Sequence, residues 1–186
     1  MMSDKRGVTL IELLIAVAIL GLVMVSIGQL LDSGVQDWQR GETKLEAEQN
    51  IRIAMEKISK DLRGAQQVLA SEATEQKLVI RLPQNVKVEY YLGSLSTGPG
   101  GITGKTLKRT FAKYSDANLT TFIPGQGYPL ESEIAGYLES INFAYDISKA
   151  DASLVKITIR SGTLPAGDNL EISSGIALRA KFLPRR

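Results

Sequence analysis

Residues 5–31 read KRGVTLIELLIAVAILGLVMVSIGQLL, and this stretch is the most apolar part of the chain. From Val8 to Leu31 all but six residues are apolar, and Glu12 carries the one charge. A helix rises about 1.5 Å per residue, so this segment is roughly 36 Å long and can cross a bilayer. Lys5 and Arg6 precede it and keep the N-terminus on the cytoplasmic side. The sequence therefore predicts a membrane-spanning helix, with the C-terminal part of the chain outside the cytoplasm.

The apolar run has two alternative interpretations. A buried helix of a soluble core normally keeps a polar face, and this stretch has none. A secretory signal peptide has a shorter apolar region that is closed by a small-residue cleavage site, and no such site follows here. A carboxylate this early in a membrane helix normally marks a function. Snorkelling to the interface explains why Glu12 is tolerated, but not why it is there.

The string from Lys5 to Leu14 resembles the class III signal of type IV pilins and type II secretion pseudopilins. The resemblance implies that prepilin peptidase cuts between Gly7 and Val8, releases residues 1–7 as a cytoplasmic leader, and leaves Val8 to be N-methylated. Gly21 also matches a glycine that is common in the family.

Two positions depart from the pattern of the family. Val8 stands where the family usually has phenylalanine, and Gln29 where many major type IV pilins have a helix-kinking proline. The second departure resembles pseudopilins and minor pilins more than major pilins.

The same resemblance makes Glu12 the glutamate at the fifth residue of the mature chain. Cleavage would leave a protonated α-amine on Val8 at neutral pH. When helices pack side by side, Glu12 would pair with the amine of a neighbouring subunit. A carboxylate left alone in a dry helix bundle is costly, so such a pair would set the register between subunits.

Past the membrane segment the helix is expected to continue. Apolar residues recur at steps of four and three, as one helix face requires: Ile51, Met55, Ile58, Leu62, Ala65 and Leu69. No proline occurs before Pro83. We predict one helix to about Ala70, with residues 8–31 as membrane anchor and fibre core and residues 32–70 as an amphipathic continuation. The stripe is too short for a coiled-coil seam and favours packing on a sheet.

From residue 71 to residue 186 the sequence predicts a β-rich globular domain. Alternating apolar residues indicate strands over residues 78–82, 86–92, 107–111, 141–147, 154–159 and 175–182. A Gly-rich loop is expected at residues 93–104 and an irregular segment at residues 112–136. A long helix followed by an antiparallel sheet is an α+β fold, and this arrangement resembles the pilin architecture.

The amino-acid composition argues against most classes of enzyme. The chain has 22 Lys and Arg against 20 Asp and Glu, a net charge of +2, with neither histidine nor cysteine. Thiolate chemistry, imidazole bases and the usual transition-metal ligands are therefore excluded. Acidic and amide residues gather in loops and are read as solvated surface: Asp116, Asn118, Asp146, Asp151, Asp168, Asn169 and Glu171. We expect no metal, no cofactor and no catalytic residue.

The later part of the chain resembles J-type minor pseudopilins and PilW-like minor pilins, most clearly over residues 50–65 and without one decisive motif. The resemblance implies a structural subunit of a type IV pilus or a type II secretion pseudopilus, at or near the tip. Its partners would be other pilin or pseudopilin subunits, prepilin peptidase, the inner-membrane assembly platform and, before assembly, membrane lipid.

The expected location is the bacterial inner membrane, crossed once, and then the fibre. The basic C-terminal end, from Arg179 to Arg186, would touch DNA only in a competence pilus; a charged edge strand is the commoner reason for such residues. The competing interpretation is a membrane-anchored enzyme or binding protein of the cell envelope that keeps its N-terminus.

Overall fold

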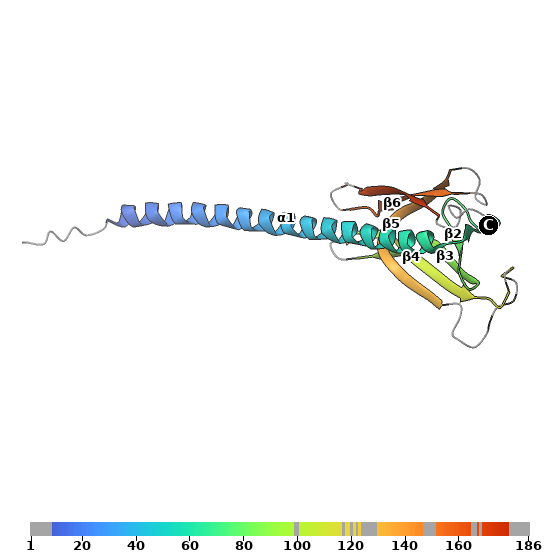
Figure 1. The fold of residues 1–186 in the computed structure, drawn as a ribbon. Coiled ribbons are helices and arrows are strands. Elements are labelled where there is room, and N and C mark those ends of the chain that lie inside the picture. Colours follow the sequence, from blue (N-terminus) through green and yellow to red (C-terminus); the bar gives the residue numbers. More distant parts are fainter. Residues whose placement is uncertain are drawn as a thin grey trace, which may run out of the picture. The chain divides into compact units, whose positions relative to one another are not determined.

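A computed structural model describes residues 9–98, 101–116, 118–119, 121, 123, 130–146, 152–164, 167 and 169–178. It divides into two compact units, residues 1–41 and residues 42–186. One helix, α1 (Leu10–Gly64), begins in the first unit and ends in the second. The expected α+β architecture is confirmed, because the C-terminal part of α1 packs on an antiparallel sheet (Figure 1).

Helix α1 ends at Gly64, whereas the sequence predicted an end near Ala70. After Gly64, which has weak helix propensity, the backbone pairs with the sheet instead. The amide of Gln66 donates to the carbonyl of Arg81 at 2.8 Å, and the amide of Leu69 donates to Val79 at 2.8 Å. The residues expected in the last helical turns therefore form a short strand, β1 (Gln67–Val68), because the sheet offers its backbone partners.

The sheet has seven strands in chain order, and each pairs antiparallel with the next. After β1 come β2 (Leu78–Leu82), β3 (Val86–Thr97), β4 (Thr103–Lys113), β5 (Leu130–Tyr145), β6 (Leu154–Ser161) and β7 (Glu171–Ala177). The strands expected over residues 78–82, 86–92, 107–111 and 154–159 are confirmed, and the strand expected over residues 141–147 is confirmed up to Tyr145, where β5 ends.

Several strand limits differ from the expectation. Strand β5 begins at Leu130, inside the segment expected to be irregular, and β3 and β4 extend into the Gly-rich stretch. Strand β7 begins at Glu171 and ends at Ala177, and residues 179–182 of the expected last strand lie outside the described residues. Residues 130–133 of β5 are all exposed, and after Leu130 they are polar, so they lack the alternation that marks a half-buried strand.

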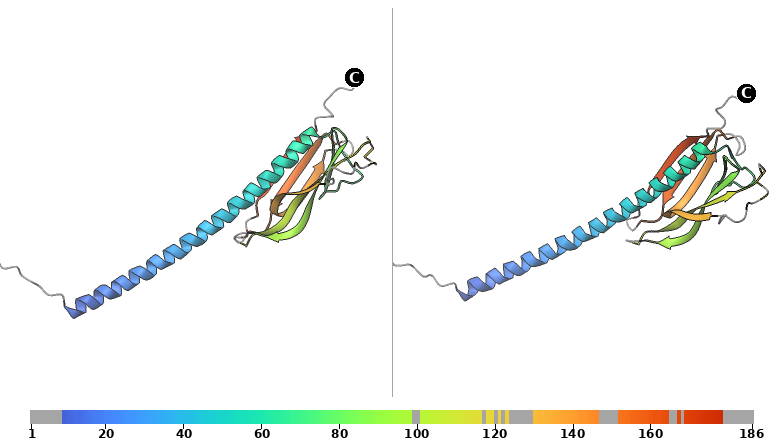
Figure 2. Two further views of the ribbon diagram at one scale, coloured as in Figure 1. Left: turned by 90° about the horizontal axis from the view of Figure 1, so that it is seen from below. Right: turned by 60° about the horizontal axis from the view of Figure 1, so that its bottom comes forward.

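Strand β5 joins two parts of the sheet. Its first half pairs with β4 and its second half with β6, and Leu138 is the residue that faces both neighbours. Register shifts interrupt both pairings close to this point, and such bulges bend a strand. The bent sheet covers one side of the C-terminal part of α1, and in the view of Figure 1 β5 and β6 are seen above the helix and β3 and β4 below it (Figures 1 and 2).

The core lies between this part of α1 and the sheet. Ile51, Ala54, Ile58 and Leu62 are completely buried. They share one cluster with strand residues that include Leu78, Val88, Leu107, Ile141, Phe143 and Ile157. The predicted stripe is therefore the buried face, although Met55 and Leu69 are only partly buried. Burying a Leu or Ile side chain contributes about 1.5–3 kcal/mol, so this face holds the helix on the sheet.

Candidate functional site

The N-terminal end of α1 is formed by the sequence Thr9-Leu10-Ile11-Glu12. The amide of Glu12 donates to the hydroxyl oxygen of Thr9 at 3.4 Å, and the amide of Leu13 donates to the carbonyl of Thr9 at 3.2 Å. Thr9 is thus the N-cap, and a glutamate three residues later completes the pattern of a capping box. The T-x-x-E spacing in the sequence signals this role of Thr9, which was not among the predicted site residues.

The carboxylate of Glu12 also lies in the first turn of α1, where a negative charge interacts favourably with the helix dipole. Within the part of the chain that the structure describes, no ion pair to Glu12 is found. The local fold therefore explains how Glu12 supports the start of the helix.

The apolar residues that follow Glu12 are uncovered. Leu10 is 82% exposed and Leu22 is 71% exposed, and every residue of α1 from Leu10 to Glu42 is exposed. By length and composition this is the one described helix that can cross a membrane. A water-soluble protein rarely leaves so large a contiguous apolar surface exposed. The segment therefore requires lipid or other apolar helices around it.

The other residues predicted for this site lie outside the described residues. These are Lys5, Arg6, Gly7 and Val8, together with the basic end from Arg179 to Arg186. Cleavage at Gly7, methylation of Val8 and contact with DNA remain predictions. Of the predicted site, the structure places Glu12, and it brings Glu12 together with Thr9.

Acidic and amide residues in the loops make local hydrogen bonds. Asp116 accepts from the amide of Thr121, Asp146 accepts from the amide and hydroxyl of Ser153, and Asn169 donates to Glu139. Glu171 pairs with Arg160 at 2.9 Å. Asp151 and Asp168 lie outside the described residues. Where the chain is described, no three His, Cys, Asp or Glu side chains gather as metal ligands would.

A polar cluster of Asp61, Tyr90 and Arg109 joins the C-terminal part of α1 to the sheet. It was not among the predicted sites. Asp61 accepts hydrogen bonds from the hydroxyl of Tyr90 on β3 at 2.7 Å and from Nε of Arg109 on β4 at 2.8 Å. Burial raises the pKa of Tyr90 well above its usual value, and the bond to Asp61 raises it further. The phenol stays protonated and remains a donor. The three residues are far apart in sequence, so no motif could have revealed them.

Comparison with known families identifies the N-terminal segment. Residues 2–28 match the family model described as the prokaryotic N-terminal methylation motif. No curated protein and no solved structure matches the chain. The match confirms the resemblance to the class III signal of type IV pilins and pseudopilins, and it includes Glu12, Thr9 and most of the uncovered apolar run.

Proposed function

We propose that this chain, whose first 28 residues contain the prokaryotic N-terminal methylation motif, is a minor pilin or pseudopilin. Prepilin peptidase cuts it between Gly7 and Val8, the new N-terminus is methylated, and the mature subunit enters a fibre through α1. The chain performs no reaction of its own in this role; it is a structural subunit.

The uncovered apolar length of α1 is the observation that carries the proposal. It has the dimensions of a membrane anchor, and its single carboxylate lies in the first turn, three residues after the N-cap. In lipid the apolar side chains are solvated by acyl chains; in a fibre they are covered by other helices. A charge so close to the helix start can meet the α-amine of an adjacent subunit, and that pair compensates the burial of both groups.

Several features support the finer assignment. The leader residues Lys5 and Arg6 favour an orientation in the inner membrane with residues 42–186 outside the cytoplasm. Gln29, in place of a proline, and the sequence of residues 50–65 favour a minor subunit at or near the tip. The partners are then other subunits, prepilin peptidase and the inner-membrane assembly platform.

Replacement of Gly7 by a bulky residue tests the proposal. We expect Gly7→Leu to remain at full length in the membrane, because the peptidase cuts after glycine, whereas wild type loses residues 1–7 and gains one methyl group. Intact-mass measurement of protein from cells with and without the peptidase reads out both changes. Asp4→Asn, a leader substitution away from the cut, is the control and should be processed normally.

The competing function, a membrane-anchored envelope enzyme or binding protein, predicts a different result. Such a protein keeps its N-terminus whether or not the peptidase is present. Equal masses of the wild-type chain in the two strains would therefore refute the proposed processing and favour that function.

A further inference from the structure

Helix α1 carries an apolar face just past the end of the apolar run. Leu31, Val35 and Trp38 recur at steps of four and three, so they lie on the same side of the helix. All three side chains are exposed, and Trp38, the one tryptophan of the chain, is 76% exposed. We call these three residues the Trp38 face. Its surface continues that of the membrane-spanning segment beyond Leu31.

The opposite side of residues 31–40 is polar. Asp32, Gln36 and Arg40 recur at steps of four and are exposed as well. The guanidinium group of Arg40 pairs with Asp37 at 3.3 Å, and both side chains remain largely exposed. This part of α1 is therefore amphipathic, whereas the run before it has no polar face. Amphipathic helical segments place their apolar face against lipid and their polar face toward water.

Two charged residues indicate where the hydrocarbon layer of a bilayer would end. Glu12 and Asp32 are consecutive charged residues of α1, and the helix between them is about 30 Å long. The hydrocarbon core of a bilayer is also about 30 Å thick, so each carboxylate can lie at one of its edges. The helix then leaves the hydrocarbon layer near Asp32, and residues 33–40 follow in the headgroup layer of that leaflet.

The indole of Trp38 is within reach of this headgroup layer. Its Cα lies about 9 Å beyond Asp32 along the helix axis, and the headgroup layer of one leaflet is about 5–8 Å thick. Side chains of a helix lean back toward its N-terminus, and tilting of the helix brings one face closer to the membrane surface. Tryptophan favours this layer because its ring is apolar and its N–H donates a hydrogen bond.

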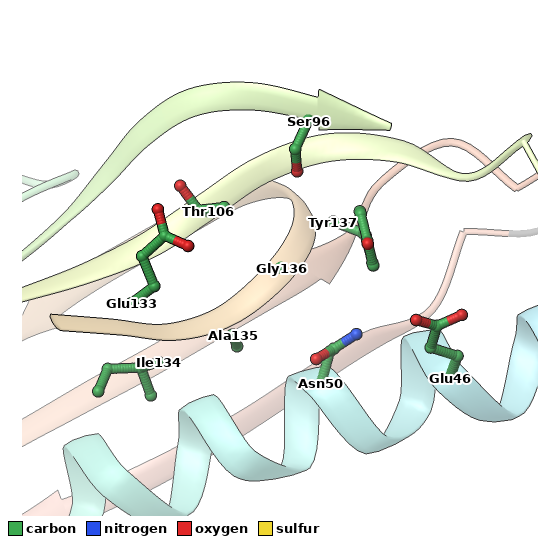
Figure 3. Close-up of a pocket in the computed structure, with 9 residues that line it drawn as sticks. All are labelled: Glu46, Asn50, Ser96, Thr106, Glu133, Ile134, Ala135, Gly136 and Tyr137. Carbon is green, nitrogen blue, oxygen red and sulfur yellow. The ribbon is translucent and has the colours of Figure 1, made fainter. Parts of the chain in front are cut away.

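Farther along α1 the surroundings are polar. Glu46 and Asn50 face a polar groove of about 430 Å³, which Ser96 and residues 133–137 line on the other side (Figure 3). A carboxylate is costly to transfer out of water, so this part of α1 is solvated by water and not by acyl chains. Along the chain, the Trp38 face thus lies between an apolar run and a water-exposed stretch, as a segment at a membrane interface does.

We propose that the Trp38 face docks on phospholipid, in the headgroup layer of the leaflet that α1 leaves near Asp32. The helix tilts toward this face, so that Leu31 and Val35 contact acyl chains and the opposite side stays in water. The contact fixes the depth and the rotation of the subunit in the membrane before assembly, which a uniformly apolar run does not. The inference rests on the part of the proposed function that places α1 in a membrane.

The single tryptophan makes the depth of residue 38 measurable. We expect the mature full chain, at one copy per phosphatidylcholine nanodisc, to emit at a shorter wavelength than free tryptophan. Lipid brominated near the glycerol end of its acyl chains should quench this emission severalfold more than lipid brominated near the methyl end. The control Trp38→Phe/Leu45→Trp moves the indole two turns along the same side of α1, to an exposed position, and should emit as free tryptophan does.

The direction of the contact is tested with spin labels, because the chain has no cysteine of its own. Labels on Val35→Cys and Gln36→Cys have nearly the same depth but lie about 100° apart around the helix. We expect oxygen, which concentrates in lipid, to relax the label at residue 35 severalfold more than the label at residue 36, and a water-soluble nickel chelate to do the reverse. Adding Trp38→Ala should reduce both differences. Circular dichroism confirms that each variant is folded.

Three results would overturn the inference. Emission like that of free tryptophan in the nanodisc would place Trp38 in water. A short emission wavelength that appears only after other subunits are added would assign the Trp38 face to a neighbouring helix. Equal relaxation of the labels at residues 35 and 36 would exclude a helix that tilts toward this face.

The N-terminal mass separates this inference from the proposed function. A processed chain in the membrane with Trp38 in water refutes the docking and leaves the function intact. Contact of Trp38 with lipid in a chain that is never processed supports the docking and refutes the assignment to a fibre. A chain that does not enter membranes at all refutes both.

Discussion

At the first turn of α1, Glu12 has two roles that one substitution can separate. Its amide is bound by the hydroxyl of Thr9, and its position at the third helical residue satisfies the capping-box pattern. Glutamine serves equally well at that position of the box, but it carries no charge. The capping role and the proposed pairing with a neighbour's amine therefore respond differently to Glu12→Gln.

We predict that Glu12→Gln is inserted, cleaved and folded normally, because the cap and the apolar run remain. Incorporation into the fibre should fall severalfold, since the ammonium group of the neighbouring subunit loses its partner. Co-purification with the other minor subunits measures incorporation, and the N-terminal mass measures processing.

Glu12→Asp, which keeps the charge, is the matched control and should retain more assembly than Glu12→Gln. A Glu12→Gln chain that assembles normally but is not cleaved would show that Glu12 acts in recognition by the peptidase instead.

At the scale of elements, α1 is one helix with two kinds of surface. Up to Glu42 its side chains are exposed, and from Thr43 onward one face is buried in the core of the second unit. The apolar face alone would let the helix slide or rotate on the sheet. Asp61 is bonded to both β3 and β4 and favours one position of the helix on the sheet, because its partly buried carboxylate meets both partners only in that register.

We predict that Asp61→Ala lowers the free energy of unfolding by about 2 kcal/mol, because it leaves the partly buried guanidinium group of Arg109 without its ion pair and Tyr90 without its acceptor. Tyr90→Phe should cost only about 1 kcal/mol, since the pair of Asp61 with Arg109 survives. Urea unfolding in detergent micelles, followed by near-ultraviolet circular dichroism, measures both.

The matched control for this cluster is Glu48→Ala on the same helix. Glu48 pairs with Arg52 at 2.8 Å, but both side chains are largely exposed, at 45% and 72%. An exposed pair contributes about 0.5 kcal/mol or less. If Asp61→Ala and Glu48→Ala lowered the free energy of unfolding equally, the partial burial of the Asp61 cluster would contribute nothing to stability.

At the scale of the whole molecule, the division into two units predicts which part folds independently. Residues 42–186 contain the sheet and the helix face that covers it, and the apolar anchor contributes no side chain to that core. The anchor is needed for the membrane and, on our proposal, for the fibre. We expect that the fold does not need it.

Deletion of residues 1–31 should therefore give a soluble, folded monomer. Size-exclusion chromatography with light scattering measures the mass, and circular dichroism measures the helix and sheet content. Deletion of residues 1–65, which also removes the buried face of α1, is the contrasting control and should aggregate or unfold. If the shorter deletion were unfolded, the limit between anchor and domain would be misplaced.

Local patterns were sufficient for α1 up to Leu62 and for most strands. The apolar run, the lone Glu12 and the stripe from Ile51 to Leu62 predicted the helix, its anchor and its buried face, because each depends on residues within a few turns of one another. Alternation likewise predicted the strands that bury one face. The T-x-x-E cap was also present in the sequence, although it was not recognised.

The remaining features depend on residues that are distant in the chain, so only the tertiary structure determines them. Helix α1 ends at Gly64 since β2 offers backbone partners to the residues that follow. Asp61 meets Tyr90 and Arg109 across 29 and 48 residues, and β5 begins where exposed polar residues give no periodic signal. Local periodicity reports which face of an element is buried. It does not report which polar groups meet when those faces pack, so the Asp61 cluster and the groove became visible only in the folded chain.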